Sequence, residues 1–507
     1  MFFTQLRSMQ ACVRPFAAAA ALALAFSTGT AGAQQGRYPG ASIRSLVMAS
    51  PSVPSAFGPR HVRIGVGTSA LISSMAPSAP ATPGLIPGRG GLALLVSILV
   101  EETQEEESFT IYVPPTPPGV ERPLLAAFHG FNVSHLDIWA NTSFIAECQA
   151  RDWILVAPYQ RNLAPTGPGT SQTAFGSAQS QLHVQAVIDY AMDQFAVDRD
   201  RVYGVGFSMG GGAALSYAAR HRDRERGAFA AVVNHTGTVS LQNVYSNADV
   251  GVQQLMVRIF NGTPSFSPFE YSRASVINLD AAGTLVPGGN HMASNLAGVA
   301  VRTYYGIGDS QQYLIDQGQS LHALMGSLGL QHELVALPAN CAPQQQGHCW
   351  STIDEAEVCD WLSSKSYQSP GPVGRILADR NGRWGEISVE PALNNEFAVV
   401  EYSVSEPQNS VRLQGTSNVD VIGLDLADLG VDPLSSWSIR SGTLDGTADE
   451  FSVTGLPGLP LSVRRNGVTL GEECQGALGP SWCFDAPSGT LRIYETSGVS
   501  AFWSVTP

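Results

Sequence analysis

Lysine is almost absent from this chain of 507 residues, in which Lys365 is the only one. The sequence therefore lacks the lysine of a nucleotide-binding P-loop and offers almost no candidate for Schiff-base chemistry. The formal net charge of −14 and the isoelectric point near 5.1 argue against nucleic acid as a partner, because binding phosphates requires a positively charged surface. The acidic run at 101–107 is interpreted as a solvated loop.

The chain also lacks an internal apolar run long enough to cross a bilayer, which takes about 20 residues. Near the N-terminus, the positively charged Arg7 and Arg14 precede an apolar stretch at 15–26. Ala31-Gly32-Ala33 then matches a signal-peptidase site. We interpret 1–33 as a cleavable signal peptide, which predicts a secreted or periplasmic protein without stable membrane insertion. An uncleaved membrane anchor is the alternative.

Cysteine is scarce, and one of the seven, Cys12, lies in the predicted signal peptide. The even number that remains fits disulfide bonding in an oxidising compartment, and no CxxC or HxxxH spacing predicts a metal site. Cys474 and Cys483 are close together and far from the others, so we predict that they pair. The other four allow three connectivities, among which the sequence does not choose: Cys148, Cys341, Cys349 and Cys359.

Composition divides the rest of the chain into segments. Residues 34–91 are rich in Pro, Ser and Gly and predict irregular structure. In 92–365, strand-like apolar runs alternate with helical patterns, which is typical of an α/β protein with a doubly wound, mostly parallel sheet. Within it, 236–298 is a long insertion expected to form a lid or pocket wall. Residues 366–375 resemble a linker, and the short strand-like runs of 376–507 predict a C-terminal all-β domain of the sandwich type.

The most informative motif is Gly206-Phe-Ser-Met-Gly210, which follows the β-branched and aromatic run at 202–205 and precedes a run of small residues. In such a nucleophile elbow a strand ends, the chain turns sharply at the serine, and a helix leaves at once. Glycines relieve backbone crowding at the turn, and the helix start directs backbone N–H groups toward the serine oxygen. Ser208 is therefore the candidate nucleophile for acyl transfer.

An acyl-transfer serine needs a base and a carboxylate that orients the base, in the chain order Ser, Asp or Glu, His. His348 lies in a loop between the last predicted strand and the last predicted helix, which makes it the candidate base ahead of His322 and His332. Asp309 directly follows a predicted strand and is the candidate orienting carboxylate, with Asp316 as the runner-up.

The oxyanion of the tetrahedral intermediate needs two hydrogen-bond donors, for which we predict the backbone N–H groups of Met209 and Phe131. Further residues are candidates for the substrate pocket on position alone, and core packing explains them equally well. His129 in particular suits a buried hydrogen-bonding brace. These candidates are His129, Trp139, Tyr159, Gln160 and His235.

Taken together, these motifs resemble the α/β-hydrolase family, and within it secreted polyhydroxybutyrate depolymerases and feruloyl esterase-like enzymes. The resemblance rests on Leu-Leu-Ala-Ala-Phe-His-Gly at 124–130, on the segment 146–158, on the elbow with its strand at 197–211, and on Gly-His-Cys-Trp at 347–350. It covers about 92–364, roughly half of the chain. It implies a Ser208–Asp309–His348 triad that cleaves esters without a cofactor, while the insertion and the C-terminal domain leave the substrate open.

The sequence thus predicts a secreted serine hydrolase acting on carboxylic esters, with a polyester or a plant-cell-wall ester among the candidate substrates. By analogy with polymer-degrading enzymes, the C-terminal domain is expected to bind a polymer or a surface. Two rival hypotheses remain, a serine peptidase that uses the same triad and a non-catalytic binding protein on a hydrolase scaffold.

Overall fold

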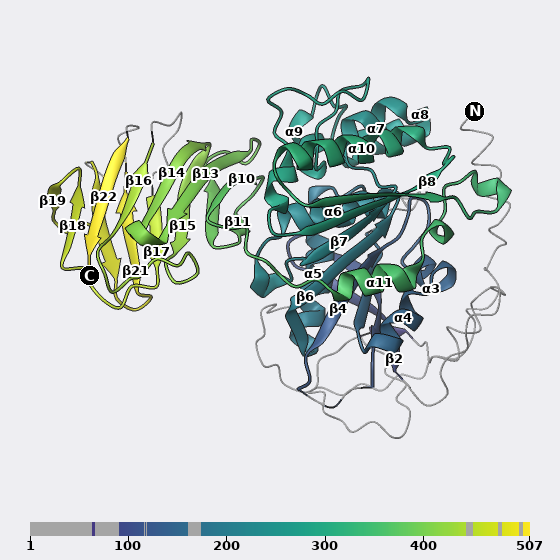
Figure 1. The fold of residues 1–507 in the computed structure, drawn as a ribbon, viewed down its shortest axis with the longest axis horizontal. Coiled ribbons are helices and arrows are strands. Elements are labelled where there is room, and N and C mark those ends of the chain that lie inside the picture. Colours follow the sequence, from purple (N-terminus) through teal and green to yellow (C-terminus); the bar gives the residue numbers. More distant parts are fainter. Residues whose placement is uncertain are drawn as a thin grey trace.

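The computed structural model describes residues 63–65, 91–115, 117, 119–160, 174–442, 450–474, 479–495 and 500–507. The predicted signal peptide and almost all of the segment 34–91 lie outside these ranges. Among the helices that are described, none is both long and apolar enough to cross a membrane. Two structural parts follow one another along the chain, an α/β part up to residue 365 and a β part from residue 373 (Figure 1).

One mixed sheet forms the centre of the α/β part. Its strand order is β1-β2-β3-β5-β4-β6-β7-β8-β9, and the pairs from β1 to β5 are antiparallel whereas those from β5 through β4 to β9 are parallel. The strands are β1 (Arg63–Gly65), β2 (Leu92–Val100), β3 (Glu105–Val113), β4 (Arg122–Phe128), β5 (Ile154–Pro158), β6 (Val197–Phe207), β7 (Ala231–His235), β8 (Ala300–Ile307) and β9 (His332–Pro338).

Helices cover both faces of this sheet because its central strands are apolar on both sides. On β4, Leu124 and Ala126 pack with α5, α6 and α10, whereas Leu125 and Ala127 pack with α3, α4 and α11. These helices are α3 (Leu136–Asn141), α4 (Phe144–Arg151), α5 (Ala178–Gln194), α6 (Met209–Arg220), α10 (Gln312–Ser327) and α11 (Glu355–Ser363). The predicted alternation of strands and helices corresponds to the section from β4 to α11.

The insertion at 236–298 is folded rather than a plain loop. It contains α7 (Leu241–Asn247), α8 (Val250–Ile259), α9 (Pro268–Ala274) and the 3-10 helix η2 (Met292–Leu296). Apolar side chains from α7, α8 and α9 form one buried cluster with Met209, the first residue after Ser208. The insertion therefore packs directly beside the elbow.

Two packed sheets make up the β part and enclose a core that includes Trp437 and Trp503. The first sheet contains β10 (Val373–Ala378), β13 (Ala398–Ser405), β14 (Ser410–Ser417), β16 (Trp437–Ser441), β22 (Ala501–Thr506), β18 (Ser462–Arg465) and β19 (Val468–Leu470). The second contains β11 (Gly382–Trp384), β12 (Ile387–Pro391), β15 (Val419–Asp425), β17 (Glu450–Thr454), β21 (Thr490–Tyr494) and β20 (Ser481–Asp485). Strand β10 begins inside the range predicted as a linker, and Cys474 and Cys483 form a disulfide, as predicted.

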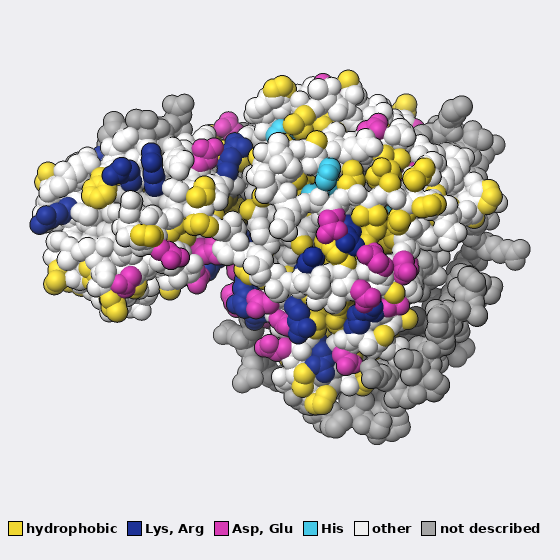
Figure 2. All heavy atoms as spheres, viewed as in Figure 1, with side chains coloured by type: hydrophobic (Ala, Val, Ile, Leu, Met, Phe, Trp, Pro, Cys, Tyr) yellow, Lys and Arg dark blue, Asp and Glu magenta, His cyan; other side chains and the backbone are white. Residues whose placement is uncertain are grey.

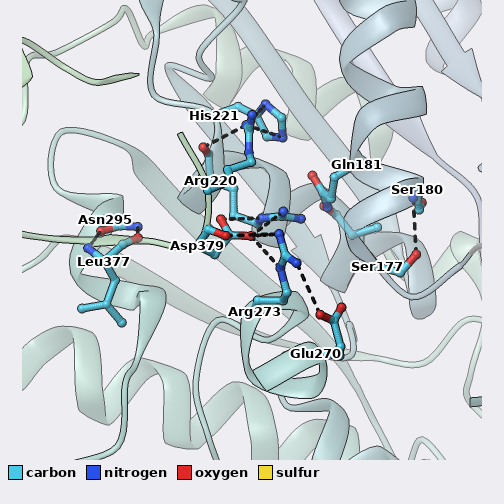
Figure 3. Close-up of polar contacts among 12 residues, drawn as sticks. Ser177, Ser180, Gln181, Arg220, His221, Glu270, Arg273, Asn295, Leu377 and Asp379 are labelled. Atoms are coloured by element: carbon cyan, nitrogen blue, oxygen red, sulfur yellow. Dashed lines mark hydrogen bonds and ion pairs between the residues drawn. The ribbon is translucent and has the colours of Figure 1, made fainter. Parts of the chain in front are cut away.

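A buried ion-pair cluster joins the two parts (Figure 3). Asp379, directly after β10, lies 2.6 Å from Nη2 of Arg220 at the end of α6, and Arg273 of α9 donates from Nε to the same carboxylate at 2.8 Å. Burial alone would raise the pKa of Asp379, but the guanidinium groups of Arg220, Arg273 and the neighbouring Arg380 lower it to about 2. The β part therefore contacts both the elbow helix and the insertion.

Candidate active site

Ser208 occupies the sharp turn between β6 and α6. Its backbone angles are φ 55° and ψ −122°, a conformation that a residue with a side chain adopts only under constraint. The flanking glycines make the turn possible: a Cβ on Gly206 would lie 2.2 Å from the carbonyl oxygen of Gly210, and a Cβ on Gly210 would lie 2.2 Å from that of Phe128. The two glycines are thus required by close backbone approach.

The structure brings the three predicted triad residues together from three separate loops. His348 Nε2 lies 2.9 Å from Ser208 Oγ, and His348 Nδ1 lies 2.8 Å from Asp309 Oδ2. This pairing assigns the ring proton to Nδ1, so that Nε2 is free to accept the serine proton. The Asp309 side chain is 1% exposed and the His348 side chain 10%, which shields their interaction from water.

A short cross-linked loop between β9 and α11 carries His348. A disulfide closes it between Cys341 and Cys349, one of the connectivities that the sequence left open. Gly347 has φ +84°, and a Cβ there would lie 2.8 Å from the Cα of Asp309. The glycine therefore allows the loop to run against the backbone of the residue that orients the imidazole.

The competing residues lie elsewhere. Asp316 is on the exposed side of α10, where Gln312 donates a hydrogen bond to it at 2.8 Å. His322 and His332 pair with each other, with their Nδ1 atoms 3.0 Å apart, and His332 also contacts Thr303. None of these three side chains is hydrogen-bonded to Ser208 in the described part of the chain.

The two predicted oxyanion donors flank the elbow. Met209 is buried and is the first residue of α6, so its N–H has no acceptor within the helix. Phe131 follows the end of β4, and this end lies against the start of α6, since a Cβ on Gly210 would approach the carbonyl oxygens of both Phe128 and His129. Phe131 also packs on Phe175, with ring centroids 5.5 Å apart.

His129 acts as a brace beneath this turn. It is fully buried, with Nε2 2.7 Å from the carbonyl oxygen of Tyr159 and Nδ1 2.9 Å from that of Gly130. Burial lowers the pKa of His129, which keeps the ring neutral near pH 7. A neutral imidazole has a single N–H, and with the proton on Nε2 it donates to Tyr159 and links the loops after β4 and β5.

Other pocket candidates have structural partners. Trp139 donates from Nε1 to Thr110 and packs in the core on the α4 and α11 side. Gln160 is buried, and its backbone N–H donates to Glu107 Oε1 at 2.8 Å.

Glu107 belongs to the acidic run interpreted above as solvated. That interpretation is wrong for this residue, because Glu107 is fully buried and its carboxylate lies 3.0 Å from Nδ1 of His183.

Aromatic rings around His348 were missed from the sequence. Phe207 lies with its ring centroid 4.6 Å from that of His348 and 4.9 Å from that of His235, and Trp350 lies 5.3 Å from Phe207. Burial and the neighbouring His348 lower the pKa of His235 to about 3, so His235 stays neutral beside the candidate base. The only sequence signal for Phe207 and Trp350 was their position, one residue before Ser208 and two after His348.

Metal binding finds little support in the described residues. The group of possible ligands there is Glu472, Cys474 and Cys483, and the two cysteines are joined in a disulfide.

On the face shown in Figure 2, basic side chains lie among acidic ones rather than in a continuous positive strip, in keeping with the net charge of −14.

Known proteins are similar to the α/β part. Residues 100–256, which include the elbow, match the Esterase family model, whose description reads "Putative esterase". One similar solved structure is a ferulic acid esterase, at 15% identity, with 54% of this chain and 97% of that chain covered and a TM-score of 0.40. Another is an S-formylglutathione hydrolase from Staphylococcus aureus, at 15% identity, with 54% of this chain and 98% of that chain covered and a TM-score of 0.37. An arylesterase is similar at 16% identity, with 58% of this chain and 89% of that chain covered and a TM-score of 0.37.

No curated protein matches the chain. The match to the family model covers under a third of the chain, and Ser208 lies within the matched segment. Residues 100–256 are similar to the Esterase family, and the chain is a carboxylic ester hydrolase.

Proposed function

We propose that Ser208, His348 and Asp309 form the catalytic triad of this ester hydrolase. The observation that carries the proposal is the continuous chain of hydrogen bonds from Ser208 Oγ through both imidazole nitrogens to Asp309 Oδ2. The serine stands on a strained turn at the start of a helix, which exposes its oxygen to a substrate.

In the proposed reaction, Ser208 Oγ attacks the carbonyl carbon of the ester while His348 Nε2 takes the hydroxyl proton. Asp309 stabilises the imidazolium, and the N–H groups of Met209 and Phe131 donate hydrogen bonds to the oxyanion. The intermediate collapses, His348 returns the proton to the leaving alcohol, and an acyl-serine remains. Water then attacks this acyl-enzyme with His348 as base, which frees the acid and restores Ser208.

The side chains packed next to the elbow are apolar. Met209 belongs to a buried cluster with Phe175, Met256, Phe260 and Tyr271, most of which come from the insertion. Within the ester class, we infer a polyester or a plant-cell-wall ester as the substrate, and a role for the β part in binding a polymer or surface. These inferences come from the sequence resemblance and from the presence of a second part, at fold level.

The wider organisation belongs to the same proposal. We interpret the α/β part as a doubly wound catalytic domain at 92–365, with the insertion at 236–298 as its pocket wall, and the β part as a separate domain at 376–507. Residues 1–33 as a cleaved signal peptide would direct the protein to the periplasm or the exterior.

A substrate panel separates this proposal from its rival, the serine peptidase. The purified full chain would be assayed with p-nitrophenyl esters of increasing acyl length, a feruloyl ester, insoluble polyesters and peptide anilides. We expect kcat/KM for at least one ester class to exceed that for every anilide, and the Ser208→Ala variant to lose turnover. Faster cleavage of peptide anilides than of all esters would overturn the proposal.

A further inference from the structure

Among the cysteines that the structure describes, two in the α/β part have no disulfide partner. The structure pairs Cys341 with Cys349 and Cys474 with Cys483, whereas Cys148 on α4 and Cys359 on α11 are free thiols. Both thiols are fully buried and belong to the same apolar cluster. These residues are 211 positions apart in sequence but lie on neighbouring helices.

Polar contacts fix the position of α4 against α11. At one end Ser143 Oγ donates to Glu355 Oε2 at 3.3 Å. At the other end Arg151 forms an ion pair with Asp360 and donates to the carbonyl oxygen of Ala356 at 3.3 Å. Both ends of α4 are therefore tied to α11, through Glu355 at one end and through Ala356 and Asp360 at the other.

The thiols lie between these two contacts. On α4, Cys148 is three residues before Arg151, and residues at that spacing share a helix face. On α11, Cys359 is four residues after Glu355 and three after Ala356, so it shares the face that contacts α4. Both cysteines thus point into the shared interface of the helix pair.

The surroundings of the pair also bear on its chemistry. Burial raises the pKa of Cys148 well above its usual value, with a further increase from the neighbouring Cys359, and burial raises the pKa of Cys359 to about 12. Few thiolates are present while the helices are docked, so exchange is slow in the folded protein and proceeds when α11 separates from α4 or before it docks.

We propose that Cys148 and Cys359 are a redox pair whose oxidised form is a third disulfide, which joins α4 to α11. The oxidant is a small-molecule or protein disulfide. The thiolate of one cysteine attacks the oxidant's S–S bond, forms a mixed disulfide and releases one thiol. The second cysteine then attacks the mixed disulfide, forms the Cys148–Cys359 bond and releases the second thiol, so that two electrons and two protons pass from the pair to the oxidant.

This bond would anchor the C-terminal end of the loop that carries His348, where the loop leads into α11. The loop is already cross-linked near β9 by the Cys341–Cys349 disulfide, and α11 begins seven residues after His348. A link from Cys359 to Cys148 fixes α11 to the body of the α/β part. We therefore expect oxidation of the pair to make the esterase more resistant to heat without changing its turnover at low temperature.

Mass spectrometry of the full-length protein tests the pairing. The protein is incubated with oxidised glutathione just below its unfolding temperature, where α11 separates from α4, and is then quenched with acid, denatured, alkylated without reduction, digested and analysed. We expect a peptide containing Cys148 joined to a peptide containing Cys359, lighter by two hydrogens than the two thiol peptides together. The Cys341–Cys349 and Cys474–Cys483 bonds, which are recovered as unalkylated cysteines within one peptide each, serve as internal controls for oxidation. Recovery of Cys148 and Cys359 as alkylated thiols, glutathione adducts or cross-links to a second chain would overturn the proposal.

Thermal unfolding provides the second readout. The unfolding temperature of each protein is measured in reducing and in oxidising buffer. The comparison is with the Cys148→Ala/Cys359→Ala variant, which retains both other disulfides. We expect the increase on oxidation to be about 5 °C larger in the wild-type protein than in this variant. An equal rise in the two proteins would contradict the proposed link. Neither cysteine belongs to the catalytic machinery, so the initial rate of ester hydrolysis at 25 °C is the control for intact folding of the variant.

Discussion

Asp379 in the β part and Arg220 at the end of the elbow helix form an ion pair in which both side chains are at most 1% exposed. Helix α6 begins at Met209, directly after Ser208, and ends at Arg220. Arg273 of the insertion binds the same carboxylate. One buried acid therefore touches both elements that pack beside Ser208.

Replacing Asp379 with alanine should destabilise the whole protein. The change leaves Arg220 and Arg273 without their carboxylate in a buried site, which typically costs about 3–5 kcal/mol. The measurement is the free energy of unfolding by chemical denaturation. The matched control is Asp428→Ala, which removes the partly exposed ion pair with Arg383 and should cost no more than about 1 kcal/mol. Equal losses in the two variants would show that the buried pair has no special role.

Stability should also depend on pH through Asp379. Arg220, Arg273 and Arg380 lower the pKa of Asp379 to about 2 in the folded protein, from a usual value of 3.8. A depressed pKa contributes stability that is fully present above the unfolded value and is lost as pH falls from about 4 to about 2. Unfolding free energies of the wild-type protein and of Asp379→Asn across this range should converge at the acid end, and a constant difference would contradict the assignment.

The elbow glycines should tolerate no side chain. In Gly210→Ala the new methyl group would lie 2.2 Å from the carbonyl oxygen of Phe128, so either β4 or the serine must move. We expect a loss of about 3 kcal/mol in stability and a large fall in kcat. Gly326→Ala in α10 is the control, because a Cβ there meets nothing within 4 Å and alanine favours a helix by about 1 kcal/mol. Full activity of Gly210→Ala would refute the close-packing argument.

Asp309 should matter for the tautomer of His348 rather than for folding. In Asp309→Asn the amide cannot stabilise the imidazolium, and kcat for an activated ester should fall by about 10⁴-fold with little change in KM. The control is Asp316→Asn, the alternative carboxylate, which lies on the exposed face of α10 and should retain wild-type rates. If Asp316→Asn were the inactive variant, the assignment of the carboxylate would be wrong.

Local geometry explains why much of the site was predictable from sequence. The elbow is encoded within five residues, since the turn itself requires glycine at 206 and 210. Asp309 and His348 follow from the chain order of the fold, because Asp309 lies just after β8 and His348 lies in the loop between β9 and α11.

Features that depend on distant partners were not predictable. The burial of Glu107 depends on His183, which lies on a helix far along the chain and offers no local signal. The short helices of the insertion are stabilised by packing against Met209 and its neighbours rather than by their own propensity. The choice of Cys341–Cys349 among three connectivities required the fold of the His348 loop.

Covalent labelling of Ser208 by a fluorophosphonate tests the central claim most directly, because this reagent reacts with an activated serine. We predict one label per folded chain, located on the peptide that contains Ser208, with no label in Ser208→Ala and slow labelling in His348→Ala. Labelling at another residue, or no labelling of a folded and monodisperse sample, would contradict the assignment of Ser208 as the acyl-accepting nucleophile.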